Sequence, residues 1–143
     1  MGSRRQSRII AFQALFGWDV NRVPLEELLL FPWLDEEHRE RVDEETLTFA
    51  RLIVSGTLEN LDAVDLAIKQ HLENWDFARL ARVDLAILRM SVYSLFYQKD
   101  IPASVTIDEA IDIVKEFGSD DSYRFINGVL DGIRRAQVGC DEG

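Results

Sequence analysis

The chain has 143 residues, of which 47% are hydrophobic and 29% are charged, and its formal net charge is −10. This composition excludes a disordered chain and is typical of one globular domain, or of two small subdomains that share a core. No apolar run approaches the roughly 20 residues of a membrane span, and the N-terminal residues lack the apolar region of a signal peptide. Cys140 is the only cysteine, which excludes an internal disulfide. We therefore expect a cytoplasmic protein that does not associate with a membrane.

No segment shows the alternation of a convincing strand, so the sequence predicts an all-α fold. The first helix is expected over residues 4–17, with Ser3 as its N-cap. A second helix is expected over residues 24–32, because Pro24 suits the first helical position. An acidic loop follows over residues 35–41.

A long helix is predicted over residues 43–75, where apolar residues recur mostly at spacings of three and four. Gly56 is expected to kink or divide it. The next segment, residues 77–97, is apolar almost all round. A helix of that kind is buried by neighbours on several sides, so we expect it at the centre of the fold.

The last two predicted helices are marked by their ends. Thr106 and Glu109 have the spacing of a capping box and predict a helix start there, and Gly118 is expected to close that helix. The final helix is expected over residues 119–136, with residues 138–143 as a loose tail.

Charge is unevenly distributed, since residues 1–18 carry +3 and residues 19–78 carry −10. The positive charge comes from Arg4, Arg5 and Arg8, which share one helical sector with the apolar residues Phe12, Leu15 and Phe16. A row of buried guanidiniums needs partners, so we expect the helix end to overhang the core and offer its arginines to an anion. The alternative is a solvated basic end that pairs with this protein's own acids.

A second basic stripe is predicted on the central helix. Arg79, Arg82 and Arg89 fall within about 80° of one another on a helical wheel, with Ala86 and Tyr93 between them. Arginine beside tyrosine can hold phosphate and stack on RNA bases. The alternative is a polar edge paired with acids such as Asp84 or Asp76.

Catalysis is not predicted, and neither a cofactor nor a metal is expected. His38 and His71 are far apart in the sequence, and the chain has no phosphate-binding loop, nucleophile elbow or dinucleotide fingerprint. Asp108, Glu109 and Asp112 are explained by the dipole of a helix N-terminus. Gly128, inside the last helix, is expected to let another helix approach closely.

Three stretches resemble the family of the bacterial transcription antitermination factor NusB. They are residues 11–16 after the arginine-rich start, residues 82–89 followed by Tyr93, and the run from Ile101-Pro102 through 106–111 into 117–131. The resemblance implies two three-helix subdomains side by side, at about residues 1–75 and 76–137, which together form a single RNA-binding domain over residues 1–137.

Family members bind the boxA element of nascent RNA with a ribosomal small-subunit protein, NusE, and help RNA polymerase pass terminators. The resemblance therefore implies boxA-type single-stranded RNA, NusE and the polymerase complex as partners, and the sequence also allows a homodimer. Family positions carry RNA-binding roles to Arg4, Arg5, Arg8, Phe16 and Arg89, to which the wheel adds Arg79 and Arg82. Asp84, Asp121 and Phe125 are the expected protein-binding residues.

Two residues depart from the family pattern. Gln6 stands where a third consecutive arginine is usual, and Phe16 stands where a tyrosine is usual. Two other functions remain open from the sequence. One is an RNA-binding accessory domain like that of ribosomal RNA cytosine methyltransferases, and the other is a helical adaptor without RNA binding.

Overall fold

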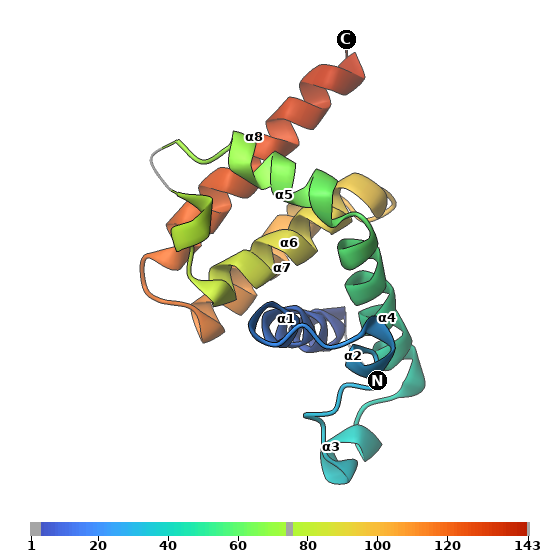
Figure 1. Cartoon of the computed structure of the whole chain (residues 1–143). Helices are drawn as coiled ribbons and strands as arrows, with labels where there is room; N and C mark the ends of the chain where they lie inside the picture. The colour runs from blue at the N-terminus through green and yellow to red at the C-terminus, as the bar shows by residue number, and fades with distance from the viewer. Residues whose placement is uncertain (1–3, 74–75, 143) are drawn as a thin grey trace.

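The computed structural model describes residues 4–73 and 76–142, and within them it contains eight α-helices, one 3₁₀-helix and no strand (Figure 1). The predicted all-α class is therefore confirmed, while the predicted N-cap Ser3 lies outside the described residues. In chain order the helices are α1 (Arg4–Val20), α2 (Leu25–Leu28), α3 (Glu36–Glu40), α4 (Glu44–Glu59), α5 (Leu61–Gln70), η1 (Phe77–Arg79), α6 (Arg82–Tyr97), α7 (Ala103–Phe117) and α8 (Ser122–Glu142).

Helix α6 lies at the centre of the fold, as its apolar sequence predicted. It contacts α1, α4, α5, α7 and α8, and it is buried from Asp84 to Leu95. The buried apolar residues form one cluster with members from both halves of the chain. The two predicted subdomains therefore share a core, and the division between them remains a prediction.

Helix α6 begins at Arg82, five residues later than predicted. Residues 77–79 form one 3₁₀ turn instead, because the Asp76 carboxylate accepts a hydrogen bond from the backbone N–H of Ala78 at 3.1 Å. Leu80 then adopts an extended conformation with ψ of 140°, which separates the turn from α6. A local cap thus overrides the continuous apolar pattern.

The long helix predicted over residues 43–75 is divided, but not at Gly56. The break comes at Asn60, whose side-chain amide donates to the carbonyl of Gly56 at 2.8 Å. Gly56 lies inside α4, and the ring of Tyr93 on α6 packs against it, where a Cβ atom would clash. The glycine serves the close approach of two helices.

Two further helix ends differ from the prediction. Helix α7 begins at Ala103 after Pro102, so Thr106 is buried inside the helix and does not form a capping box. Helix α8 continues to Glu142, which makes residues 138–142 helical where a loose tail was expected. Gly139 has the lowest helix propensity in this stretch, and a single glycine costs only about 1 kcal/mol relative to alanine. In Figure 1 this end of α8 extends beyond the other helices.

The acidic loop predicted over residues 35–41 contains the short helix α3. Asp35 caps it by accepting a hydrogen bond from the backbone N–H of His38 at 2.8 Å. Helix α2 before it has only four residues, and the chain then turns at Phe31, which has a φ of 50°.

Candidate nucleic-acid and partner interface

The first two arginines of α1 lie where this helix meets α4 and α7. Arg5 forms ion pairs with Glu109 and Asp112 of α7, and its Nε lies 3.2 Å from Glu109 Oε2. Arg4 lies over the ring of Phe49, 3.8 Å from the centroid. The hydrogen bond and charge of Glu109 raise the pKa of Arg5. Both arginines are exposed, so they contact this protein's own side chains and remain open to solvent.

Arg8 does not overhang the core, which corrects the sequence prediction. It is only 3% exposed, and its guanidinium lies 5.8 Å from the centroid of the Phe49 ring. Burial lowers the pKa of Arg8, the charge of Glu109 opposes this, and the charge of Arg4 lowers it further. Among the described residues, Arg8 Nε has no hydrogen-bond partner. Arg8 is thus part of the core, and contact with RNA would require its guanidinium to become exposed.

The stripe predicted on the central helix is also wrong as a single surface. Arg79 is exposed but lies in η1, outside α6, with Asp76 3.9 Å away. Arg89 is buried and makes two hydrogen bonds to Asp65 of α5, of 2.9 Å from Nε and 3.0 Å from Nη2. Of the three arginines, Arg82 alone is both on α6 and exposed. The acids beside Arg89, Asp65 and Asp19, are not those suggested by the sequence for this stripe, Asp84 and Asp76.

Asp19, near the end of α1, joins three arginines, of which one follows α1 and two lie on α6. Its carboxylate lies 3.1 Å from Arg82 Nη1, 3.5 Å from Arg89 Nη1 and 3.5 Å from Arg22 Nη2. We call Asp19, Asp65, Arg22, Arg82 and Arg89 the aspartate–arginine cluster. Sequence reasoning missed both aspartates, because Asp19 and Arg82 are 63 residues apart and no local spacing links them.

Phe16 is half-buried against the core about one turn before Asp19. A helix rises about 1.5 Å per residue, which puts Arg5 and Asp19 roughly 21 Å apart along α1. The predicted RNA-binding residues therefore form two groups, one at each end of this helix. RNA that contacted both would have to follow α1 along its length.

The three predicted protein-binding residues come together in one pocket of about 340 Å³, which we call the acidic pocket. Asp84 of α6 is buried, and its Oδ2 accepts a hydrogen bond from Ser122 Oγ at 3.0 Å. Its other oxygen has no hydrogen-bond partner among the described residues. Burial raises the pKa of Asp84, which the Ser122 hydrogen bond opposes. The pocket is lined by Arg79, Leu80, Ala81, Asp84, Ser119, Asp121, Ser122 and Phe125.

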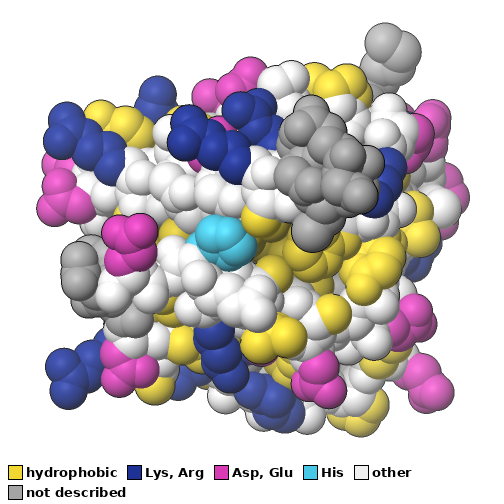
Figure 2. All heavy atoms as spheres, turned by 90° about the horizontal axis from the view of Figure 1, so that it is seen from above, with side chains coloured by type: hydrophobic (Ala, Val, Ile, Leu, Met, Phe, Trp, Pro, Cys, Tyr) yellow, Lys and Arg dark blue, Asp and Glu magenta, His cyan; other side chains and the backbone are white. Residues whose placement is uncertain are grey.

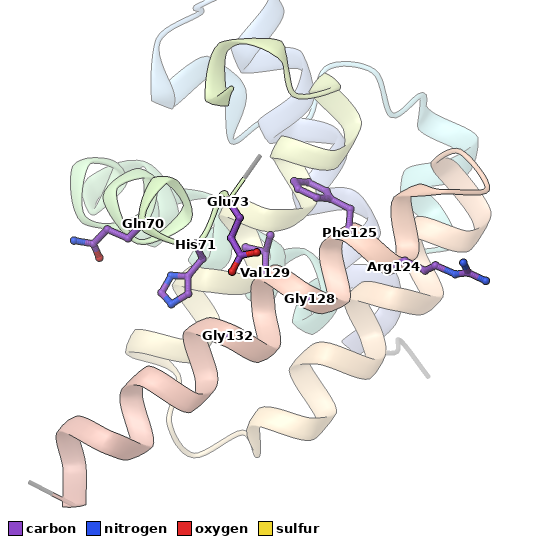
Figure 3. A pocket seen from close by; sticks show the side chains of 8 residues that line it. All are labelled: Gln70, His71, Glu73, Arg124, Phe125, Gly128, Val129 and Gly132. Atoms are coloured by element: carbon purple, nitrogen blue, oxygen red, sulfur yellow. The ribbon is translucent and has the colours of Figure 1, made fainter. Parts of the chain in front are cut away.

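A second pocket, of about 440 Å³, lies between the end of α5 and α8 (Figure 3). Sequence reasoning did not find it, and it corrects the expectation for Gly128. A Cβ atom on Gly128 would meet no atom of the described residues within 4 Å, so none of the described helices packs closely against it. The close neighbour is at Gly132 instead, where a Cβ atom would lie 3.0 Å from Cδ2 of His71. The pocket is lined by Gln70, His71, Glu73, Arg124, Phe125, Gly128, Val129 and Gly132.

Positive charge does not form one continuous surface on the face drawn in Figure 2. Lys and Arg side chains gather in separate groups there, with Asp and Glu side chains between them.

The two histidines contact neighbours within their own segments. His38 Nδ1 lies 2.7 Å from the carboxylate of its capping Asp35, and His71 Nδ1 lies 2.9 Å from the carbonyl of Ala67. Within the described residues, no group of His, Cys, Asp and Glu could hold a metal ion. Among the described helices, none combines the length and apolarity that a membrane span needs.

The profile of the NusB family matches residues 5–135 of this chain. The transcription antitermination protein NusB of Treponema denticola is 50% identical over 131 residues, which cover 92% of this chain and 95% of that protein. NusB of Bacillus pumilus is 44% identical over 131 residues, covering 92% of this chain and 94% of that protein.

Solved structures agree with these sequence matches. T. maritima NusB is 41% identical and superposes with a TM-score of 0.83, covering 94% of this chain and 93% of that one. A crystal structure of the antitermination factors NusB and NusE in complex with double-stranded RNA contains a chain that is 27% identical. That chain superposes with a TM-score of 0.82, covering 93% of this chain and 96% of its own length.

Proposed function

Because this chain belongs to the NusB family of transcription antitermination proteins, we propose that it binds boxA-type RNA together with the ribosomal protein NusE. In this role it is the non-catalytic RNA-binding component of an antitermination complex on RNA polymerase. The relative solved with NusE and RNA supports the pair of partners.

The observation that carries the proposal is that predicted protein-binding residues and a predicted RNA-binding arginine line the acidic pocket together. Asp84, Asp121 and Phe125 line one pocket, and Arg79, from the predicted RNA-binding set, lines it too. The two proposed surfaces therefore adjoin at η1. An RNA held by Arg79 and Arg82 would pass beside a protein seated in this pocket, so each partner could stabilise the other's binding.

The exposed arginines suit an RNA surface. Arg4 and Arg5 at one end of α1, and Arg79 and Arg82 at the other, can each contact a phosphate. The rest of the chain is strongly acidic, which repels phosphate elsewhere and favours a basic protein partner.

The test is a titration of labelled boxA-type RNA, with a scrambled strand and a duplex of the same sequence as controls, each with and without NusE. If four exposed arginines contact single-stranded phosphate, log K should fall with log salt at a slope of about −3. NusE should tighten binding of the boxA strand more than that of the scrambled strand. Equal binding of both strands in the presence of NusE, or a flat salt dependence, would contradict the proposal.

A further inference from the structure

We propose that the Asp19 carboxylate occupies the position of an RNA phosphate in the aspartate–arginine cluster and thereby limits RNA affinity. This inference rests on the proposed RNA binding. It assigns to Asp19 the role of an affinity-determining residue that competes with the ligand for Arg82 and Arg22.

The location of Asp19 is unfavourable for a carboxylate by local rules. It lies in the last turn of α1, a turn that has no basic residue. The negative end of a helix dipole disfavours an acidic side chain there. The contacts that hold it come from other segments, with Arg82 Nη1 3.1 Å from both its Oδ2 and its backbone carbonyl. The position of the Asp19 side chain is therefore stabilised by its arginine partners and not by the end of its own helix.

Exposure differs across the cluster in the way that competition requires. The Asp19 side chain is 13% exposed, whereas those of Arg82 and Arg22 are 58% and 61% exposed. Arg82 and Arg22 thus face solvent, while the Asp19 carboxylate is largely buried. An approaching phosphate would meet guanidiniums whose charge is already partly neutralised.

The rest of the cluster can keep its shape without the Asp19 charge. Arg89 retains two hydrogen bonds to Asp65, and Arg22 lies over the Trp18 ring, 3.9 Å from its centroid. The cluster would then contain three arginines and one carboxylate, Asp65, which pairs with Arg89. Neutralising Asp19 should therefore free Arg82 and Arg22 for phosphate and leave the buried pair in place.

The test compares Asp19→Asn with the unmodified protein in binding to the boxA-type strand. The variant should bind about fivefold more tightly at low salt, the weight of one exposed ion pair. Its salt slope should be steeper by about 0.7, because Arg22, which is not among the four arginines counted in the unmodified protein, then contacts one more phosphate. Asp131→Asn is the matched control. Asp131 lies 3.0 Å from Arg134 and 2.9 Å from Arg135 on α8, so its loss changes net charge equally, away from α1.

A gain confined to Asp19→Asn supports the inference, and adding Arg22→Gln should then return the salt slope to that of the unmodified protein. Equal gains in Asp19→Asn and Asp131→Asn would reduce the effect to net charge and overturn it. Unchanged or weaker binding by a folded Asp19→Asn would do the same. Should that variant fail to fold, Asp19→Gln repeats the measurement, and unfolding of both assigns Asp19 to the scaffold and rejects the inference. Salt-independent binding by the unmodified protein would instead contradict the proposed function.

Discussion

The two arginine groups at the ends of α1 differ in how they accommodate a buried guanidinium. Each has exposed members and one buried member, Arg8 at the start of the helix and Arg89 at its end. Arg89 has a bidentate carboxylate partner, while Arg8 lies near an aromatic ring with its Nε unpaired among the described residues. The comparison separates arginines that build the fold from those that remain available for RNA.

This difference determines what each buried arginine contributes to stability. A buried ion pair costs desolvation, but removing one partner leaves an uncompensated buried charge and costs far more. Arg89 is in that position, because Asp65 would be left behind. Removing Arg8 leaves no comparable orphan, so its contribution should come mainly from the packing of its aliphatic stem.

The largest effect is expected for Arg89→Ala, which should lower the free energy of unfolding by about 3 kcal/mol. That loss corresponds to a decrease in melting temperature of roughly 10 °C for a chain of this size. Urea unfolding followed by circular dichroism measures it. Arg82→Ala is the control within the same cluster and should lose less than about 1 kcal/mol, because its side chain is exposed. Equal losses for the two variants would remove the distinction between buried and exposed arginines.

A smaller effect is expected at Arg8, where two substitutions separate packing from charge. Arg8→Ala should lose about 2 kcal/mol, because it leaves a cavity beside Phe49. Arg8→Met keeps an apolar stem and removes the desolvated charge, so it should recover most of that loss. The same unfolding measurement distinguishes them. If methionine were as destabilising as alanine, the guanidinium itself would be contributing, and the two ends of α1 would be alike.

Asp84 gives a pH-dependent prediction in the acidic pocket. Because burial raises its pKa in the folded state above the ordinary 3.8, the folded protein binds this proton more tightly than the unfolded chain does. Its stabilising contribution is full below pH 3.8 and is lost as the pH rises through the folded-state pKa. Asp84→Asn should therefore be more stable than the unmodified protein at pH 7, by on the order of 1 kcal/mol.

The check is the difference in melting temperature between the two proteins across pH 3.5 to 7, which cancels the titration of all other acids. The difference should shrink toward zero as the pH falls to about 3.8. NusE binding should weaken at the same time, if Asp84 serves the partner. A stability difference that did not vary with pH would assign the effect to the Ser122 hydrogen bond alone.

The sequence predicted the helical class and the central helix well, since both depend on apolar periodicity over many residues. It failed at helix ends decided by single contacts, such as the Asp76 cap before α6 and the proline before Ala103. It also named three residues that line the acidic pocket, Asp84, Asp121 and Phe125. The resemblance to the family was what pointed to Asp121.

What the sequence could not give was the depth of each arginine. A helical wheel placed Arg8 and Arg89 on helix faces that were expected to bind RNA. Whether such a side chain is buried, however, depends on neighbours that are distant in the chain. Asp65 and Asp19 determine the surroundings of Arg89 from 24 and 70 residues away, and neither leaves a local pattern. The same limit hid the competition that we infer at Asp19.

The smallest structural effect is expected for Arg5→Gln. Arg5 is exposed and its ion pairs with Glu109 and Asp112 are open to solvent, so the melting temperature should barely change. RNA affinity should nevertheless fall about fivefold, and the salt slope should flatten by about 0.7, because one phosphate contact is lost. Glu109→Gln is the matched control, since it removes one of the competing carboxylates and should shift affinity in the opposite direction. If Arg5→Gln destabilised the fold and left RNA binding intact, the N-terminal arginines would join Arg89 in the scaffold, and the RNA surface would be confined to the far end of α1.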